Sequence, residues 1–331
     1  MSFLVATVLL AVVTAVACAL PGTFVVLRKN SMLVDAISHA VLPGIVLGYF
    51  FTRDLDSPLL VLGAALAGLV VVLGSEWLSR TGLLTGDAPQ GLIFPALFSV
   101  GVILVTLNFA DVHLDTHAVL VGDLNLAAFV PIVVGGVSIG PAYLYLMLGI
   151  LALNIAFLAA FSTRLTLTTF DAAFARTIGI RTGLLNAAFM LLVSLTVTAS
   201  FNGTGAILVV ALMIVPPATA YLISRRLSVM ITLTVVIAVV GALAGFWLAY
   251  VLDAATSAGM AVFYGLIFIA VFGLSRLTRR GSRARALAAM QARPAARPAT
   301  QEAGVTHTAS VAARPSGNGE PPSTATLSTS E

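Results

Sequence analysis

Asp35 and His39 are the two residues whose types and spacing best fit chemistry in this chain. They stand four residues apart in an apolar stretch, and positions i and i+4 share one face of a helix. An imidazole nitrogen and a carboxylate oxygen are suitable ligands for Mn, Fe or Zn. We predict a transient site for a divalent transition metal, because two ligands bind weakly enough to let an ion pass. A buried ion pair, or a histidine bonded to a backbone carbonyl, is the alternative.

A second group of potential ligands lies between residues 111 and 117, in the sequence Asp-Val-His-Leu-Asp-Thr-His. Asp111, His113, Asp115 and His117 suit a metal by type, but nothing in the sequence fixes their geometry. His113, Asp115 and His117 are therefore weaker metal-binding candidates. An ordinary solvated loop, or a docking surface for a partner, is the alternative.

A third feature is the predicted loop 165–183, which contains a short alanine-rich stretch. Thr169 or Asp171 could cap the start of a helix that includes Ala175 and ends at Gly179. Three apolar residues fall on one face of that helix at positions i, i+4 and i+8, namely Phe170, Phe174 and Ile178. An exposed apolar stripe often marks a partner surface. Folding of the stripe back onto the membrane is the alternative.

The composition indicates the elements that must position these groups. Of the 331 residues, 59% are apolar and 9% charged, and the mean hydropathy is +1.07. These values indicate an all-α polytopic membrane protein with about eight to nine transmembrane helices. The apolar runs fall near 3–27, 32–51, 58–78, 90–108, 143–162, 184–201, 205–223, 229–251 and 259–275. A weaker run, 126–139, contains Pro131 and Gly135-Gly136 and predicts a re-entrant or interfacial piece.

The charges predict how the chain lies in the membrane. Cations recur in alternate predicted loops, which are cytoplasmic by the positive-inside rule, so the C-terminus is expected inside. Residues 1–275 carry 9 cations and 10 acids, whereas residues 276–331 carry 8 cations and 3 acids. We therefore predict a transmembrane domain (1–275), a basic juxtamembrane segment (276–290) that meets anionic lipid, and a disordered tail (291–331). Nucleic acid is not an expected partner.

Several functions are excluded by simple absences in the sequence. Lys29 is the single lysine and follows no glycine-rich loop, so the chain has no Walker A motif and is not expected to hydrolyse ATP itself. Cys18 is the single cysteine, which excludes an internal disulfide and a multi-cysteine metal cluster. We expect neither an enzyme nor a permanently bound cofactor.

Four ordered stretches resemble the permease subunits of bacterial ABC importers for manganese, zinc and iron. Leu27-Arg28-Lys29, followed by residues 35–44 (DAISHAVLPG), is similar to the family's LRR or LRK and DAxSHAxLPG pattern. Residues 87–94 (DAPQGLIF) resemble its entry to the fourth span, and residues 170–179 its coupling segment. Residues 205–220 resemble its GxLLVxALLIxPAATA span, with Pro217 in place of the usual alanine. The resemblance covers about residues 4–274.

The resemblance implies an importer permease that works as a pair in the bacterial plasma membrane. It implies cytoplasmic ATP-binding subunits and an extracytoplasmic metal-binding protein as partners. Asp35 and His39 would then bind the passing Mn²⁺, Zn²⁺ or Fe²⁺, with manganese favoured. Phe170, Asp171, Phe174, Ala175 and Gly179 would contact the ATPase, and the linker 111–125 would face the delivery protein.

Two other function classes are compatible with the same residues. One is a metal carrier driven by an ion gradient without an ATPase, whose inverted repeats are not evident in the sequence. The other is an intramembrane hydrolase that uses Asp35, His39 and a serine such as Ser38. Uptake into liposomes distinguishes all three, because it would require the ATPase, a gradient, or would not occur.

Overall fold

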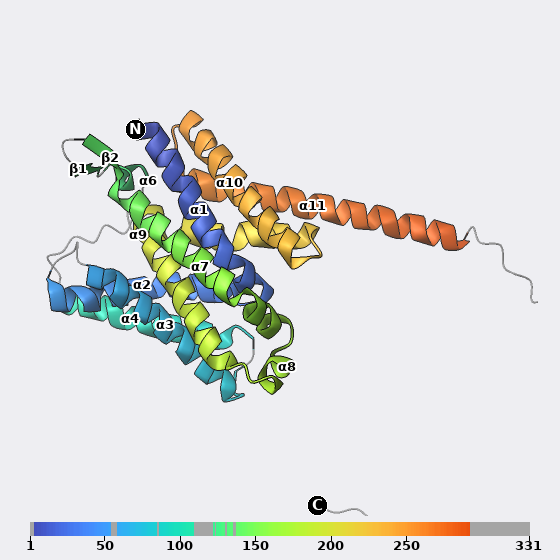
Figure 1. Cartoon of the computed structure of the whole chain (residues 1–331), viewed down its shortest axis with the longest axis horizontal. Helices are drawn as coiled ribbons and strands as arrows, with labels where there is room; N and C mark the ends of the chain where they lie inside the picture. Colours follow the sequence, from blue (N-terminus) through green and yellow to red (C-terminus); the bar gives the residue numbers. More distant parts are fainter. Residues whose placement is uncertain are drawn as a thin grey trace, which may run out of the picture. The chain divides into compact units, whose positions relative to one another are not determined.

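The computed structural model describes residues 3–53, 58–84, 86–108, 122, 124–129, 131–134 and 137–291. The chain divides into two compact units, residues 1–282 and 283–331. The helices are α1 (Phe3–Leu27), α2 (Ser31–Thr52), α3 (Pro58–Arg80), α4 (Ala88–Asn108), α6 (Leu124–Ala127), α7 (Ala142–Phe170), α8 (Ala172–Thr177), α9 (Thr182–Ile223), α10 (Leu227–Val251) and α11 (Thr256–Gln291) (Figure 1).

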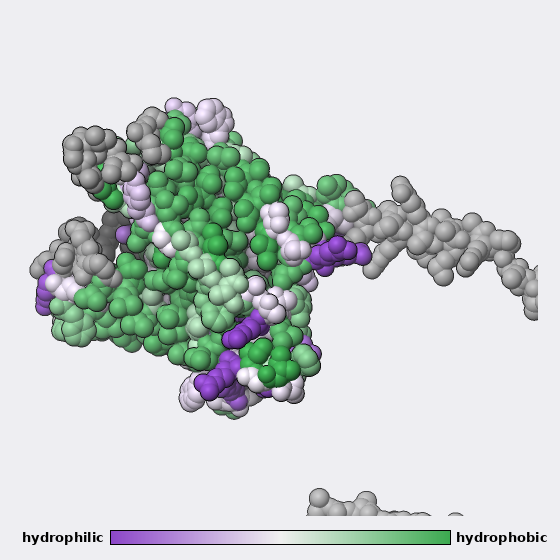
Figure 2. Space-filling view, viewed as in Figure 1, coloured by the Kyte–Doolittle hydropathy of each residue, from purple (hydrophilic) through white to green (hydrophobic). Residues whose placement is uncertain are grey.

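The expected polytopic helical architecture is confirmed. Eight of the described helices are long and apolar enough to cross a bilayer. Figure 2 shows a mostly apolar face on the main body, with hydrophilic residues gathered near one end. A chain whose surface is this apolar is stable where lipid rather than water surrounds it.

Helix α9 contains two of the nine predicted apolar runs. Its 42 residues would extend about 63 Å as one straight helix, about twice the thickness of a hydrocarbon core. The backbone leaves helical geometry at Gly205, where φ is 74° and ψ is 167°. Glycine adopts such a positive φ without the steric cost that a side chain would bring. The helix therefore consists of two halves, residues 182–204 and 205–223.

The two halves of α9 run in opposite directions along α1. In the first half, Asn186 bonds to Arg28 and Ser200 to Cys18, so this half is antiparallel to α1. In the second half, the backbone of Met213 lies against Gly22, and Tyr221 lines a groove with Leu27. This half is therefore parallel to α1. The chain turns back at Gly205, and both predicted runs can cross the membrane.

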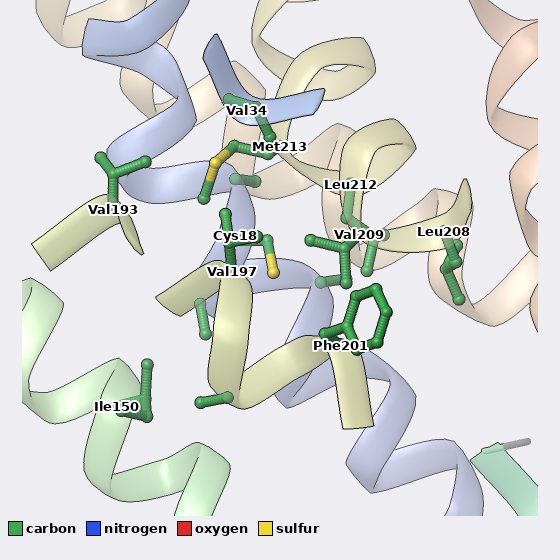
Figure 3. Close-up of a cluster of buried hydrophobic side chains, with 14 of the residues drawn as sticks. Cys18, Val34, Ile150, Val193, Val197, Phe201, Leu208, Val209, Leu212 and Met213 are labelled. Carbon is green, nitrogen blue, oxygen red and sulfur yellow. The ribbon is translucent and has the colours of Figure 1, made fainter. Parts of the chain in front are cut away.

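The core lies where the two halves of α9 enclose α1. Figure 3 shows Cys18 of α1 between Val193, Val197 and Phe201 of the first half and Leu208, Val209, Leu212 and Met213 of the second half. Buried polar groups join α7 to this core. Asn154 donates from Nδ2 to the Ala17 carbonyl and to Thr196 Oγ1, each at 3.1 Å. Such bonds hold helices together where lipid offers no hydrogen-bonding partner.

Tyr143 of α7 fastens the end of the first half of α9. Its hydroxyl donates to the carbonyls of Ala199 and Ser200 and accepts from the N–H of Gly203 at 3.1 Å. Backbone groups near a helix break need such partners, because hydrocarbon supplies none.

Helix α2 is held against α3 at glycine residues. A Cβ on Gly44 would lie 2.6 Å from the carbonyl oxygen of Gly63, and a Cβ on Gly48 would lie 3.0 Å from the Cα of Leu60. Small residues let helix backbones approach closely in membranes. The position of α2, and of the side chains on its other face, is therefore fixed by backbone contact.

Three features differ from the sequence-based expectations. A two-stranded antiparallel sheet, β1 (Pro131–Val134) and β2 (Val137–Pro141), occupies most of the weak run 126–139. Proline breaks a helix there, and Val and Ile favour strands. Helix α7 ends at Phe170 rather than near 162, because Thr166 and Thr169 bond to carbonyls one turn earlier within the helix. Helix α11 continues to Gln291, through the predicted basic segment 276–290.

Candidate functional site

Asp35 and His39 lie on one face of α2, as the spacing predicts. Nε2 of His39 lies 3.7 Å from Oδ1 of Asp35, which is longer than a hydrogen bond. The His39 side chain is 37% exposed and that of Asp35 is 45% exposed on the single chain. The pair is therefore neither tightly bonded nor fully buried, and both groups are free to turn toward a ligand.

Two aromatic residues of α4 hold the imidazole in place. The ring of Phe94 stacks on His39 with centroids 5.3 Å apart and planes inclined by 19°. Phe98 meets the same imidazole edge-on, at 6.1 Å between centroids. The sequence analysis missed both residues. The signal was the spacing of four between Phe94 and Phe98, which places them on one face of the helix that follows Asp87.

A single copy of the chain supplies two metal ligands at this place. No group of three or more His, Cys, Asp or Glu side chains that could bind a metal occurs among the described residues. Divalent transition metals take four or more ligands in stable protein sites. The pair can contribute to such a site, but water or a second molecule must complete it.

The second candidate cluster cannot be placed. Asp111, His113, Asp115 and His117, with most of the linker 111–125, lie outside the described residues. Their proposed capture of a metal stays a prediction, as does the role of the linker in facing a delivery protein. The predicted tail 291–331 likewise lies outside the described residues, apart from Gln291.

The predicted short helix of the 165–183 region is confirmed as α8. Asp171 is its N-cap, and its side chain accepts a hydrogen bond of 2.9 Å from the backbone N–H of Phe174. Gly179 follows the helix with φ of 84°, a value that favours glycine. The helix lies between the ends of α7 and α9 (Figure 1).

The apolar face of α8 and its flanks projects away from the protein. Phe170, Phe174 and Ile178 are 65%, 51% and 53% exposed, whereas Ala175 is buried. The alternative that this stripe covers apolar surface of the same chain is not what the structure has. An exposed aromatic stripe beside arginines fits a protein partner at the membrane surface.

Comparison with known proteins gives one family. The profile of the ABC 3 transport family matches residues 1–275. The chain is 43% identical over 265 residues to the zinc transport system membrane protein TroD of Treponema pallidum, covering 80% of this chain and 72% of that protein. It is 37% identical over 272 residues to the manganese transport system membrane protein MntD of Bacillus subtilis, covering 82% and 92%.

A solved structure has the same fold. PsaBC from Streptococcus pneumoniae, in complex with Fab, superposes with a TM-score of 0.67 at 25% identity. The match covers 82% of this chain and 91% of the PsaBC chain. The apolar span region, and not only one motif, is therefore shared.

Proposed function

The chain belongs to the ABC 3 transport family, and from this premise we propose that it is the membrane permease of an ATP-driven importer of divalent transition metals. The observation that carries the proposal is the half-exposed pair Asp35 and His39 on α2. Ionisable groups at membrane depth are costly and face a path, a cavity or a protein partner. Their loose pairing suits an ion that must bind and leave again.

A second copy of the chain is the partner that completes the metal site. One copy offers one carboxylate and one imidazole, and two copies related by a twofold axis would offer two of each. Helix α4, which lies against His39, has only 6% of its spanning window buried, against 61% for α2. That open face beside the pair supports an interface there.

The cargo belongs to the group Mn²⁺, Zn²⁺ and Fe²⁺, and we propose manganese as the first metal to test. Imidazole suits zinc and iron, and carboxylate oxygen suits manganese, so the ligand types admit all three. Named relatives transport zinc in one case and manganese in another. Competition among the three metals in an uptake assay decides the order.

ATP is hydrolysed by separate cytoplasmic subunits, which contact α8 and its exposed residues Phe170, Phe174 and Ile178. The linker 111–125 faces the extracytoplasmic metal-binding protein that delivers the cargo. The permease lies in the bacterial plasma membrane with its C-terminus in the cytoplasm, because the arginines of alternate loops then lie inside.

Reconstitution tests the function. The chain is placed in liposomes with and without its ATPase and delivery partners, and uptake of ⁵⁴Mn, ⁶⁵Zn and ⁵⁵Fe is followed. We expect uptake that requires ATP and the ATPase. Uptake driven by an ion gradient without the ATPase would make the chain a secondary carrier, and absence of uptake under every condition would overturn the proposal.

Two variants test the site itself. Asp35→Asn and His39→Ala should abolish uptake but leave assembly and basal ATP hydrolysis in place. Met32→Ala is the matched control, because Met32 is 52% exposed on the same helix one turn earlier and offers no hard ligand. Normal uptake by both site variants would exclude Asp35 and His39 from the metal path.

A further inference from the structure

Arg28 occupies the turn between α1 and α2 and bonds to side chains of two other helices. Its Nε donates to Thr169 Oγ1 at 3.0 Å, and one terminal nitrogen donates to Thr168 Oγ1 at 3.1 Å. The other terminal nitrogen donates to Asn186 Oδ1 at 2.8 Å. The planar guanidinium is suited to such a fork of bonds, which a lysine cannot reproduce.

The three acceptors flank the coupling segment on both sides. Thr168 and Thr169 belong to the last turn of α7, directly before Asp171 caps α8. Asn186 belongs to the first turns of α9, directly after the segment. Arg28 therefore joins the two ends of the α8 region to the turn from which α2 begins.

The charge of Arg28 is held in place without a carboxylate in contact. Its guanidinium carbon lies 4.9 Å from the centre of the Phe189 ring, a cation–π arrangement. Burial lowers the pKa of Arg28 to about 10, which leaves the group charged at neutral pH. The nearest acid in the network is Glu76 of α3, whose Oε2 accepts from Asn186 Nδ2 at 3.3 Å.

The start of α2 has features of a segment that can shift. Lys29, next to Arg28, has φ of 58°, a left-handed conformation that residues other than glycine rarely adopt. A cavity of about 150 Å³ adjoins this point, lined among others by Asn30, Ser75 and Gln90. Within the described part of the chain, Ser75 Oγ and Gln90 Oε1 have no hydrogen-bond partner. A polar cavity of this size admits water, so movement of α2 toward it leaves no dry void.

We propose that Arg28 is the positioning residue that couples the ATPase-facing segment to the helix that carries Asp35 and His39. The inference rests on the proposed function. A displacement of α8 by the ATPase moves Thr168, Thr169 and Asn186, and the guanidinium transmits it to the turn seven residues before Asp35. A coupling of this kind requires contacts that differ between two arrangements of the protein, and the fork of Arg28 is the contact that changes.

The test measures the metal ions moved per ATP hydrolysed, in liposomes that contain the full transporter. Arg28→Gln should lower this ratio at least about tenfold, within the usual range of allosteric coupling, while basal ATP hydrolysis and metal binding to the permease stay unchanged. Arg28→Lys keeps the charge but not the fork, so its ratio should fall between those of Arg28→Gln and the wild type. Arg164→Gln, an exposed arginine one turn before Thr168, is the control and should keep the wild-type ratio.

A second pair of variants removes the acceptor instead of the donor. Thr169→Val deletes a hydroxyl that touches Arg28, and Thr166→Val deletes one that bonds only within α7 in the same i to i−4 manner. Thr169→Val should lower the transport ratio and Thr166→Val should not. Combining Thr169→Val with Arg28→Lys should cost less than the sum of the two single effects, because both remove the same contact.

The outcomes separate the two proposals. If the wild type moves no metal with ATP, the proposed function fails and the role of Arg28 fails with it. If the wild type is active and both Arg28→Lys and Thr169→Val keep the wild-type ratio, only the role of Arg28 is overturned. Should Arg28→Gln fail to accumulate in the membrane, Arg28→Lys and Thr169→Val give the decision alone.

Discussion

The two faces of α2 are built on opposite principles. One face carries Gly44 and Gly48 and lies against the backbone of α3, where there is no room for another carbon atom. The other face carries Asp35 and His39, which are half exposed and 3.7 Å apart. Rigid attachment on the first face fixes where the second face points. Loose pairing on the second face leaves its ligands free for an ion that arrives and departs.

The largest effect is expected on the packed face. Gly44→Ala should destabilise the protein by about 3 kcal/mol, because the new Cβ overlaps the backbone of α3. Gly91→Ala in α4 is the matched control, since a Cβ there meets nothing within 4 Å. An alanine in an open helical position stabilises by about 0.5–1 kcal/mol relative to glycine. Thermal unfolding in detergent measures both. Equal melting temperatures for the two variants would contradict the close packing of α2 on α3.

The exposed face should show the reverse pattern. His39→Leu should change the stability of the metal-free protein by less than about 0.5 kcal/mol, because an exposed ion pair contributes little. Saturating metal at about 100 times the dissociation constant should stabilise the wild type by about 2.7 kcal/mol, and this gain should vanish in the variant. The assay is the melting temperature with and without Mn²⁺. A metal-induced shift that persists in the variant would place the binding site elsewhere.

A smaller effect is expected at the ring that orients His39. Phe94→Leu removes the stacking partner, and aromatic pairs contribute about 0.5–1.5 kcal/mol, so apparent metal affinity should weaken about 3- to 10-fold. Phe98→Leu, which removes only an edge contact, should weaken it less. Metal titration of the two purified variants gives the comparison. A larger loss in Phe98→Leu would show that stacking on Phe94 does not orient the imidazole.

The smallest effect concerns the end of α2 and should leave both faces intact. Arg53 caps the helix in a left-handed conformation with φ of 53°. Glycine avoids the steric cost of about 1–2 kcal/mol but loses about 0.5–1 kcal/mol of chain entropy. Arg53→Gly should therefore raise stability by about 0.5–1 kcal/mol without altering uptake. A change in uptake would link the outer end of α2 to the metal site.

Much of the fold follows from the sequence because membrane spans are long and apolar. The predicted run 3–27 coincides with α1, and the run 229–251 differs from α10 by two residues. The end of α7 was missed because its last turns carry polar Thr and Arg residues that resemble a loop by composition. The fold-back of α9 leaves only Gly205 as a sequence signal, and hydropathy alone cannot say in which direction the next half runs.

The site follows from the sequence only in part. The spacing of Asp35 and His39 predicts their shared face, because both belong to one helix. Phe94, which is 55 residues further along the chain, reaches His39 only through the packing of α4 on α2. Arg28 was interpreted as a marker of the cytoplasmic side. Its bonds to Thr168, Thr169 and Asn186 span about 140 to 158 residues of sequence, a separation that no local pattern encodes.

The turn at Gly205 also decides a matter of parity. Eight spanning helices alone would return the chain to the side from which it entered, whereas a hairpin inside α9 adds one more passage and places the two ends on opposite sides. A tag at one end then reports a different compartment from a tag at the other. A single glycine thus determines which end of this protein an antibody added to intact cells can reach.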